Sequence, residues 1–458
     1  MIERIIDFSV RRRWLVLLIT LAAVVSGFWS LTKLPIDAVP DVTNVQVQVN
    51  AVAPALTPVE IEKQVTVALE TVLAGTPGLE STRSFSRNGF AQITAVFTDR
   101  TNIYFARQQV SERINEAKAN LPPGVDIKLG PISTGLGEIY WWAVEYAKPG
   151  AIVPVLDGQP GWQSDGTYLT PEGERLTDDF QRTVYLRTVQ DWIIRPQMKT
   201  VPGVAGADAI GGFVKQFQVQ PDPQRLISFG LSLNQVIEAI EANNVSRGAN
   251  YIEQNGERYV VRASGRVENI EDISQIVVAT RAGVPIRVKD VADVVIGKEL
   301  RTGSASVNGR EVVLGTTLML IGGNSRTVAA AADAKIKEIS RTLPPGIYAH
   351  TVLNRTQLVD ATIETVATNL AEGALLVIVV LFLLLGNLRA AVVTACVIPV
   401  TMMLTATGML QGKISANLMS LGALDFGLIV DGAVIIAENS LRHLAERQRQ
   451  VRRMLALD

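Results

Sequence analysis

Three carboxylates near the carboxyl end of the chain stand in a segment that is otherwise apolar. They are Asp425, Asp431 and Glu438, and the segment runs from Leu424 to Asn439. An ionised side chain near the centre of a bilayer costs on the order of 2.5 to 3.5 kcal/mol on insertion scales, so such residues mark a functional site. Burial in a low-dielectric medium favours the neutral form of a carboxyl group, which can then bind and release protons. The segment therefore predicts a proton relay inside a membrane.

Helical geometry places two of these carboxylates on one face. At about 100° per residue, Asp431 and Glu438 lie within about 20° of each other around the axis, whereas Asp425 lies about 120° away. Asn417 and Ser420 fall near the Asp431 face. Such a polar stripe must face protein or water, because lipid offers no hydrogen-bond partners. The alternative is that the carboxylates pair with basic residues and only lock helices together.

Membrane-spanning segments are needed to position these residues, and about 20 apolar residues cover the hydrocarbon core. The chain has 458 residues, of which 48% are hydrophobic, and this is too apolar for one ordinary soluble domain. We therefore expect four transmembrane helices. The segments that meet the length are Trp14 to Leu34, about Thr365 to Leu385, Ala390 to Leu410 and Leu418 to Leu441.

Basic residues indicate the orientation of these spans. Arg11, Arg12 and Arg13 precede the first span, and Arg389 lies in the short connection between the second and third. Lys and Arg concentrate on the cytoplasmic side, so both termini belong inside and residues from about 36 to 360 belong outside. A cleavable signal peptide is the alternative for the first span. Its apolar run, however, exceeds the usual length of about 7 to 15 residues.

The exported region begins with a β-α-β-β-α-β order, typical of a split β-α-β sandwich. Alternating apolar residues predict strands, and helical periodicity predicts the two helices. A strand, a helix and a strand recur at 312–320, 327–339 and 347–352. In both copies the last helix ends at a Leu-Pro-Pro-Gly sequence, 121–124 or 343–346, and a strand follows. This repetition favours an internal duplication over chance reuse of a helix-stop signal. The first set comprises 45–52, 58–73, 80–86, 90–97, 102–120 and 125–129.

A region with a different sequence pattern separates the two copies of the unit. It contains Asn255-Gly256, a strong signal for a β-hairpin. Residues 148–177 are rich in Pro and Gly and predict a surface loop. We expect a first span at 1–35, porter units at 36–134, at 135–179 and at 275–360, an inserted docking unit at 180–274, and spans with a basic tail at 361–458.

Composition excludes several classes of protein. The formal net charge is −1 from 43 basic and 44 acidic residues, which gives no general attraction to nucleic acid. Cys396 is the single cysteine, so no disulfide forms within the chain. His350 and His443 lie too far apart in sequence to make a clustered zinc site by themselves. Nucleotide-binding glycine loops and nucleophile elbows are missing from the sequence, which disfavours an enzyme.

Four stretches together resemble a known family. The sequence from Asp425 to Asn439, Asp-Phe-Gly-Leu-Ile-Val-Asp-Gly-Ala-Val-Ile-Ile-Ala-Glu-Asn, is similar to the fourth-span signature of resistance-nodulation-division (RND) transporters of the heavy-metal efflux branch. It is closer to the cobalt-zinc-cadmium group than to the copper-silver group, with Ala437 as a small departure. The other matching stretches are 34–41 (Leu-Pro-Ile-Asp-Ala-Val-Pro-Asp), 135–140 (Gly-Leu-Gly-Glu-Ile-Tyr) and 190–196 (Gln-Asp-Trp-Ile-Ile-Arg-Pro).

The resemblance implies an α+β membrane protein with four transmembrane helices, duplicated ferredoxin-like porter units and a docking subdomain. It implies a secondary active transporter that exports zinc, cobalt, cadmium or nickel ions in exchange for protons, without a cofactor. The partners would be a periplasmic adaptor and an outer-membrane channel, around a homotrimer in the inner membrane. Asp425, Asp431 and Glu438 take the proton-relay positions. Glu138 takes a metal-binding position. The alternative is that Glu138 is only a charged residue at the edge of a strand.

Three other functions stay open at this point. A drug exporter of the same superfamily would prefer an aromatic-lined porter pocket and a different surround of the paired aspartates. A protein-export accessory subunit with RND-like spans would have six spans and no metal phenotype. A remnant that binds partners without transport is the third. The family continues beyond the position of Asp458 with a second exported domain and eight further spans, so we expect a fragment, one half of a split pump or a remnant.

Overall fold

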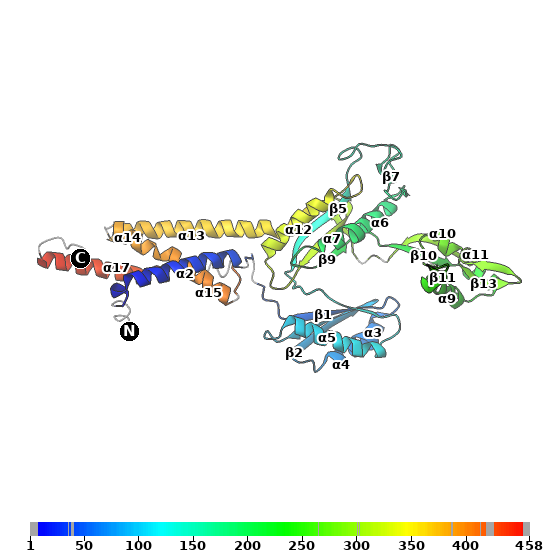
Figure 1. The fold of residues 1–458 in the computed structure, drawn as a ribbon, viewed down its shortest axis with the longest axis horizontal. Helices are drawn as coiled ribbons and strands as arrows, with labels where there is room; N and C mark the ends of the chain where they lie inside the picture. The colour runs from blue at the N-terminus through cyan, green and yellow to red at the C-terminus, as the bar shows by residue number, and fades with distance from the viewer. Residues whose placement is uncertain are drawn as a thin grey trace.

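The elements form two groups in the computed structural model, apolar helices at one end and sheets at the other (Figure 1). The structure describes residues 8–34, 36–37, 41–263, 265–299, 301, 303–385, 388–412, 414–417 and 426–451. The first porter unit and the inserted unit lie as separate lobes beside a central second unit (Figure 1). The helix α13 runs without interruption from the apolar group to this central unit.

Three described helices are long and apolar enough to cross a membrane: Arg13–Lys33, Arg355–Val380 and Ala391–Gln411. The fourth expected span begins in 418–425, which lies outside the described residues. Its later part is a helix that packs against the second and third spans. The helices of this group are α2 (Arg13–Lys33), α13 (Arg355–Leu385), α14 (Leu388–Ala395), α15 (Val397–Gln411) and α17 (Phe426–Val451).

The third hydrophobic segment, α14 followed by α15, has a one-residue interruption in its helical pattern. The α-helical pattern is interrupted at Cys396, and Pro399 lies in the first turn of α15. A proline fits the first turn of a helix because the amide hydrogens there have no partner within the helix. The hydroxyl of Thr401 donates to the carbonyls of Val397 and Ile398, at 2.9 Å each. Pro399 therefore lies directly after the interruption, and the Thr401 hydroxyl bonds carbonyls of the same first turn.

The first four-stranded sheet is antiparallel, with strand order β2-β3-β1-β4. Alternation along β1 buries Val47, Val49 and Ala51 beneath the helices and leaves the residues between them half-buried. Thr57 and Asn102 begin the two helical segments by accepting backbone hydrogen bonds. The elements are β1 (Gln46–Val52), α3 (Pro58–Ile61), η1 (Glu62–Thr66), α4 (Val67–Leu73), β2 (Leu79–Arg87), β3 (Phe90–Phe97), α5 (Ile103–Ala117), η2 (Lys118–Asn120) and β4 (Asp126–Leu129).

The sheet built around β5 repeats this topology. In it β5 pairs with β17 and β18, and β17 pairs in turn with β9 and β16. The order β9-β17-β5-β18 matches β2-β3-β1-β4, and both copies carry a π-helical turn in their first helical segment. This correspondence supports the internal duplication. The elements are β5 (Glu138–Tyr146), α6 (Asp179–Val189), η3 (Gln190–Ile194), α7 (Arg195–Met198), β9 (Val204–Ile210), β16 (Ala305–Val307), β17 (Arg310–Met319), α12 (Ser325–Ser340) and β18 (Ile347–Asn354).

The segment 148–177, expected as a plain surface loop, folds into a small antiparallel sheet of order β6-β7-β8. Tyr168 of this sheet is fully buried in the core of the second unit. Its hydroxyl donates to the carbonyl of Pro345 at 2.9 Å. The expectation was wrong because strands of two residues have no sequence periodicity to detect. These strands are β6 (Gly161–Trp162), β7 (Tyr168–Leu169) and β8 (Arg175–Leu176).

Packing moves the boundaries expected for the insert. Helices α6 and α7, inside the expected range 180–274, contribute Leu186 and Met198 to the core of the second unit. The insert leaves and returns through the strand pair β10–β15, so its own elements extend from Lys215 to Lys298. Its hairpin turns at Asn255 and Gly256, both with positive φ, as the Asn-Gly signal predicts. The elements are β10 (Lys215–Pro221), α8 (Pro223–Phe229), α9 (Leu233–Asn243), β11 (Arg247–Gln254), β12 (Glu257–Ala263), α10 (Ile270–Ser274), β13 (Val277–Arg281), β14 (Val284–Arg287), α11 (Val288–Val291) and β15 (Ala292–Lys298).

Candidate functional site

The helix α17 carries two of the three acidic residues from the apolar segment. Asp431 lies in its second turn, with its side chain outside the described parts, and Glu438 follows two turns later with an exposed side chain. Asp425 lies outside the described residues. Val434, between the two acids, packs against Ala391 and Ile398 of the neighbouring helices. The structure therefore places this helix within the apolar group and not apart from it.

Glu438 makes no ion pair with any residue in the described parts of the chain. Farther along α17, Glu446 lies 3.4 Å from Arg442 and 3.6 Å from His443, and all three side chains are exposed. The basic end of the helix thus has its own acidic partner. The alternative in which Glu438 only locks helices through an ion pair gains no support from the described residues.

Close packing joins the first and third apolar segments. A Cβ atom on Gly27 of α2 would lie 2.3 Å from the Cβ atom of Met403 of α15. The hydroxyl of Ser30 donates to that of Thr407 at 3.4 Å, and Ser30 is buried. Small residues at such a crossing let the two backbones approach closely. The crossing of α2 and α15 is therefore tightly packed.

Glu138, the expected metal-binding residue, is the first residue of β5 and is exposed. It lies opposite Leu318 of β17 in the sheet register. The preceding residue, Gly137, accepts a backbone hydrogen bond from Met319 at 2.8 Å, which fixes the start of the strand. The structure does not bring Glu138 together with the carboxylates of α17. Within the described residues, no group of three or more His, Cys, Asp and Glu side chains could hold a metal ion.

The aromatic residues after Glu138 belong to the core. Tyr140 and Trp142 are fully buried, and Trp142 donates to the side-chain oxygen of Gln190 at 2.8 Å. The hydroxyl of Tyr140 donates to Asp333 at 3.0 Å and contacts Thr351 at 2.6 Å. Burial raises the pKa of Tyr140, and Asp333 raises it further. Tyr140 therefore stays neutral and positions the strand.

A buried ionic cluster at the other end of β5 was missed by sequence reasoning. Glu145 is 5% exposed and accepts from the hydroxyl of Tyr348 at 2.7 Å. Its other oxygen lies 3.0 Å from Nη2 of Arg310, and Nδ1 of His350 lies 3.5 Å from the first. No sequence signal could have joined these residues, because the register of three strands brings them together.

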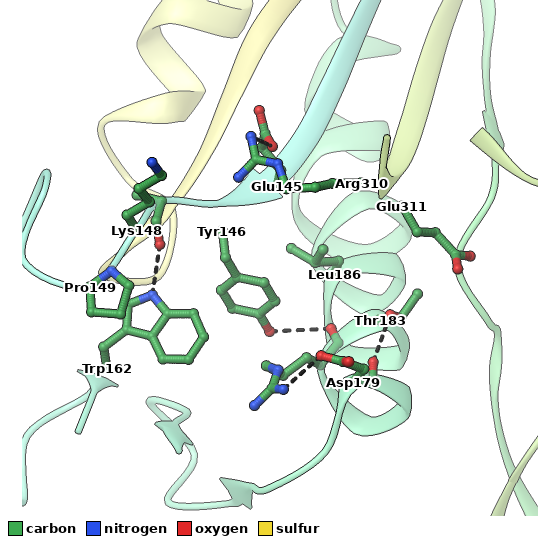
Figure 2. A pocket seen from close by; sticks show the side chains of 12 residues that line it. Glu145, Tyr146, Lys148, Pro149, Trp162, Asp179, Thr183, Leu186, Arg310 and Glu311 are labelled. Atoms are coloured by element: carbon green, nitrogen blue, oxygen red, sulfur yellow. Dashed lines mark hydrogen bonds and ion pairs between the residues drawn. The ribbon is translucent and has the colours of Figure 1, made fainter. Parts of the chain in front are cut away.

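A cavity of about 520 Å³ opens beside this cluster. Figure 2 shows Glu145 and Arg310 at one side and Tyr146, Trp162 and Asp179 at the other. The hydroxyl of Tyr146 donates to the carbonyl of Arg182 at 3.2 Å. The carboxylates and basic groups in the lining balance each other, so the cavity offers no excess negative charge to a metal cation.

Comparison with known proteins shows what the whole chain resembles. The model of the AcrB/AcrD/AcrF family matches residues 5–456. The nickel and cobalt resistance protein CnrA of Cupriavidus metallidurans is 57% identical over 459 residues, which cover 100% of this chain and 43% of CnrA. The cobalt-zinc-cadmium resistance protein CzcA of the same organism is 55% identical over 448 residues, covering 98% of this chain and 40% of CzcA.

A solved structure shows the same fold. The crystal structure of a heavy metal efflux pump, in its crystal form II, superposes with a TM-score of 0.79 at 32% identity. The alignment covers 96% of this chain and 41% of that chain. This chain thus spans about two fifths of the length of the curated relatives it matches. The family match over nearly all of its residues shows that the chain belongs to the AcrB/AcrD/AcrF family of RND efflux pumps, and it corresponds to the amino-terminal part of the heavy-metal members.

Proposed function

We propose that the chain acts in an inner-membrane pump that exports divalent metal cations in exchange for protons. The observation that carries the proposal is the position of α17, whose acidic residues stand on a helix packed against α13, α14 and α15. The similar proteins named above confer resistance to nickel, cobalt, zinc and cadmium by their names, which makes these ions the candidate cargo.

Protons would pass through the carboxylates of the apolar segment. Asp425, Asp431 and Glu438 are the proposed relay residues, with Asp431 and Glu438 on one helical face because they are two turns apart. Moving one charge across the membrane potential releases about 2.3 kcal/mol per 100 mV, which can drive export of a cation against its gradient. Proton binding removes the charge of a carboxylate and changes which helix packing is favoured.

Metal capture would begin at Glu138. An exposed carboxylate at the fixed start of a strand is accessible to a cation and well positioned by its backbone. Carboxylate oxygen and imidazole nitrogen suit divalent ions of this kind, whereas thioether sulfur suits Cu(I). One carboxylate does not complete a metal site, so the other ligands would come from side chains that meet this edge of the sheet.

The proposed location and assembly follow from the same family. Residues from about 36 to 360 would lie in the periplasm, with both porter units above the membrane and the insert facing a partner. That insert, 215–298 by its packing, would dock an outer-membrane channel, and a periplasmic adaptor would clamp the pump. A homotrimer is the proposed oligomeric state.

Neutralising the central relay residue tests the proposal. Cells that depend on the complete pump should lose zinc and cobalt tolerance with Asp431→Asn, because an amide cannot bind and release a proton. Proteoliposomes should lose zinc-driven proton flux at the same time. Glu446→Gln is the matched control, since it removes one carboxylate from the same helix at an exposed position. Full tolerance with Asp431→Asn would contradict the proposal, and extrusion of a hydrophobic dye without any metal response would favour a drug exporter.

A further inference from the structure

A largely buried arginine at the start of α13 joins three parts of the chain. The side chain of Arg355 is 11% exposed. Its Nη1 donates to the carbonyl of Leu136 at 2.8 Å, while its Nε and Nη2 lie 3.2 and 3.1 Å from Oδ1 of Asp37. Asp37 follows α2, and Leu136 immediately precedes Gly137 and Glu138. One guanidinium group thus holds the end of α2, the start of α13 and the loop that leads to Glu138.

Asp37 extends this connection to the segment after α15. Its backbone N–H donates to the carbonyl of Ala416 at 3.0 Å, and Ile36 pairs with Ala416 in a parallel bridge. Ala416 also packs in a buried cluster with Leu34 and Met409. The end of α15 is therefore attached to the same aspartate that binds Arg355, and α15 packs in turn against α17.

The chemistry of arginine matters at this position. A guanidinium group is planar, always charged and carries five N–H donors, so it can bond a carboxylate and a carbonyl simultaneously in a fixed geometry. A lysine ammonium cannot reproduce this arrangement. A second pair, Arg326 and Asp360, joins α12 to α13 at 2.6 Å, but both of its side chains are about half exposed. Exposed ion pairs of that kind contribute little to stability, whereas breaking a largely buried pair such as that of Arg355 with Asp37 is costly.

We propose that Asp37, Leu136, Arg355 and Ala416, which we call the Arg355 junction, couple the protonation state of α17 to the position of Glu138. The inference rests on the proposed function, since it takes Asp431 as a relay residue and Glu138 as a metal ligand. A shift of α17 displaces α15, against which it packs, and Met409 of α15 packs with Ala416. Asp37 follows through its backbone bond to Ala416. Arg355 then transmits the displacement to the carbonyl of Leu136, so it acts as a positioning residue.

Thiol labelling measures this coupling without any metal. The complete pump would carry Glu138→Cys as the only reactive thiol, with Cys396→Ser removing the exposed native one. Asp431→Asn then mimics the protonated relay. We expect it to change the maleimide labelling rate at position 138 by about fivefold, within the ordinary range of allosteric coupling. Arg355→Gln should abolish this response, so that labelling becomes independent of the residue at position 431.

Control variants separate coupling from loss of fold. Arg326→Gln removes the same charge from the neighbouring pair and should leave the labelling response intact. Arg355→Lys and Asp37→Asn keep most of the side-chain volume and should each reduce the response while the protein still elutes as an assembled pump. A response that is equal with and without Arg355, or missing when Arg355 is present, would overturn the inference.

Zinc measurements keep this inference distinct from the proposed function. In proteoliposomes, Arg355→Gln should lower the maximal rate of zinc-driven proton flux about tenfold while the zinc KM changes little, because capture and release lose their link to the relay. Glu138→Gln should instead raise the zinc KM. If the pump did not transport zinc but kept the Arg355-dependent labelling response, zinc would be excluded as the transported ion. The coupling through the Arg355 junction would still be supported.

Discussion

At the scale of single residues, the ionic cluster around Glu145 shows how one buried charge is satisfied. Its carboxylate meets a tyrosine hydroxyl, a guanidinium group and an imidazole, supplied by β17 and β18. A buried carboxylate is stable only when its oxygens are bonded in this way. The cluster therefore serves the stability of the second unit.

Removing this carboxylate should destabilise the second unit. Glu145→Ala leaves the hydroxyl of Tyr348 and the charge of Arg310 without their partner, and we expect a loss of about 1 to 3 kcal/mol in the free energy of unfolding. Thermal denaturation followed by near-ultraviolet circular dichroism would measure it. Glu311→Ala is the control, because that carboxylate pairs with Arg301 at a partly exposed position. Equal stability of the two variants would contradict the prediction.

The carboxyl group of Asp333 makes the stability of the fold depend on pH. Burial alone would raise the pKa of its carboxyl group, but hydrogen bonds from Lys337, Tyr140 and Thr351 outweigh burial and hold the pKa below the ordinary value of 3.8. A carboxylate with a lowered pKa in the folded state stabilises the fold above its unfolded pKa, and this contribution disappears as the pH falls through the folded pKa.

Asp333→Asn should therefore make the free energy of unfolding less dependent on pH in the acidic range. Between about pH 6 and pH 3, the native protein should lose more stability than the variant, because the amide has no proton to bind. Urea unfolding midpoints at several pH values would measure the difference. An unchanged slope against pH would show that Asp333 does not titrate in this way.

At the scale of elements, the crossing of α2 and α15 depends on a glycine. A Cβ atom at Gly27 would approach the backbone oxygen of Met403 to 2.5 Å, and backbone cannot rotate away as a flexible side chain can. The two helices must separate if anything larger stands there.

Gly27→Val should weaken this helix pair. Overpacking of a close contact costs about 1 to 3 kcal/mol, so we expect a lower melting temperature in detergent and poorer recovery of folded protein. Gly408→Val is the control on α15, since a Cβ atom there meets no heavy atom within 4 Å among the described residues. If the two variants melt alike, the crossing is looser than the structure shows.

Much of the element order could be predicted from the sequence because local patterns determine it. Alternation predicted the strand β1, and Asn255-Gly256 predicted the hairpin between β11 and β12, since both signals act over a few residues. Periodicity says that one face of α6 is buried, but not which core it joins. The insert therefore began at 180 in the prediction, whereas Lys215 starts its first strand.

The candidate site was predicted unevenly for the same reason. Spacing alone put Asp431 and Glu438 on one helical face, because both lie on the same element. The contacts of Arg355 with Asp37 and Leu136 join residues that are distant in sequence, and only the packing of three elements creates them. The roles of Asp425, Asp431, Glu438 and Glu138 are proposals.

At the scale of the whole molecule, the proposed topology predicts which positions face which side of the membrane. In cells whose outer membrane is permeabilised, an impermeant maleimide should label Gly150→Cys, which lies in the exported region. It should label His443→Cys only after the inner membrane is opened as well. Both variants would carry Cys396→Ser, and labelling of both positions in intact spheroplasts would refute the orientation.

The uninterrupted helix α13 has a mechanical consequence. Its 31 residues extend about 46 Å, and about 30 Å of hydrocarbon would enclose only part of that length. The remainder stands out as a stiff lever arm that enters the second unit through β18 without a hinge loop. A tilt of 10° at one end would move the other by about 8 Å, so in the proposed topology a small rotation within the membrane would displace the second unit by a larger distance.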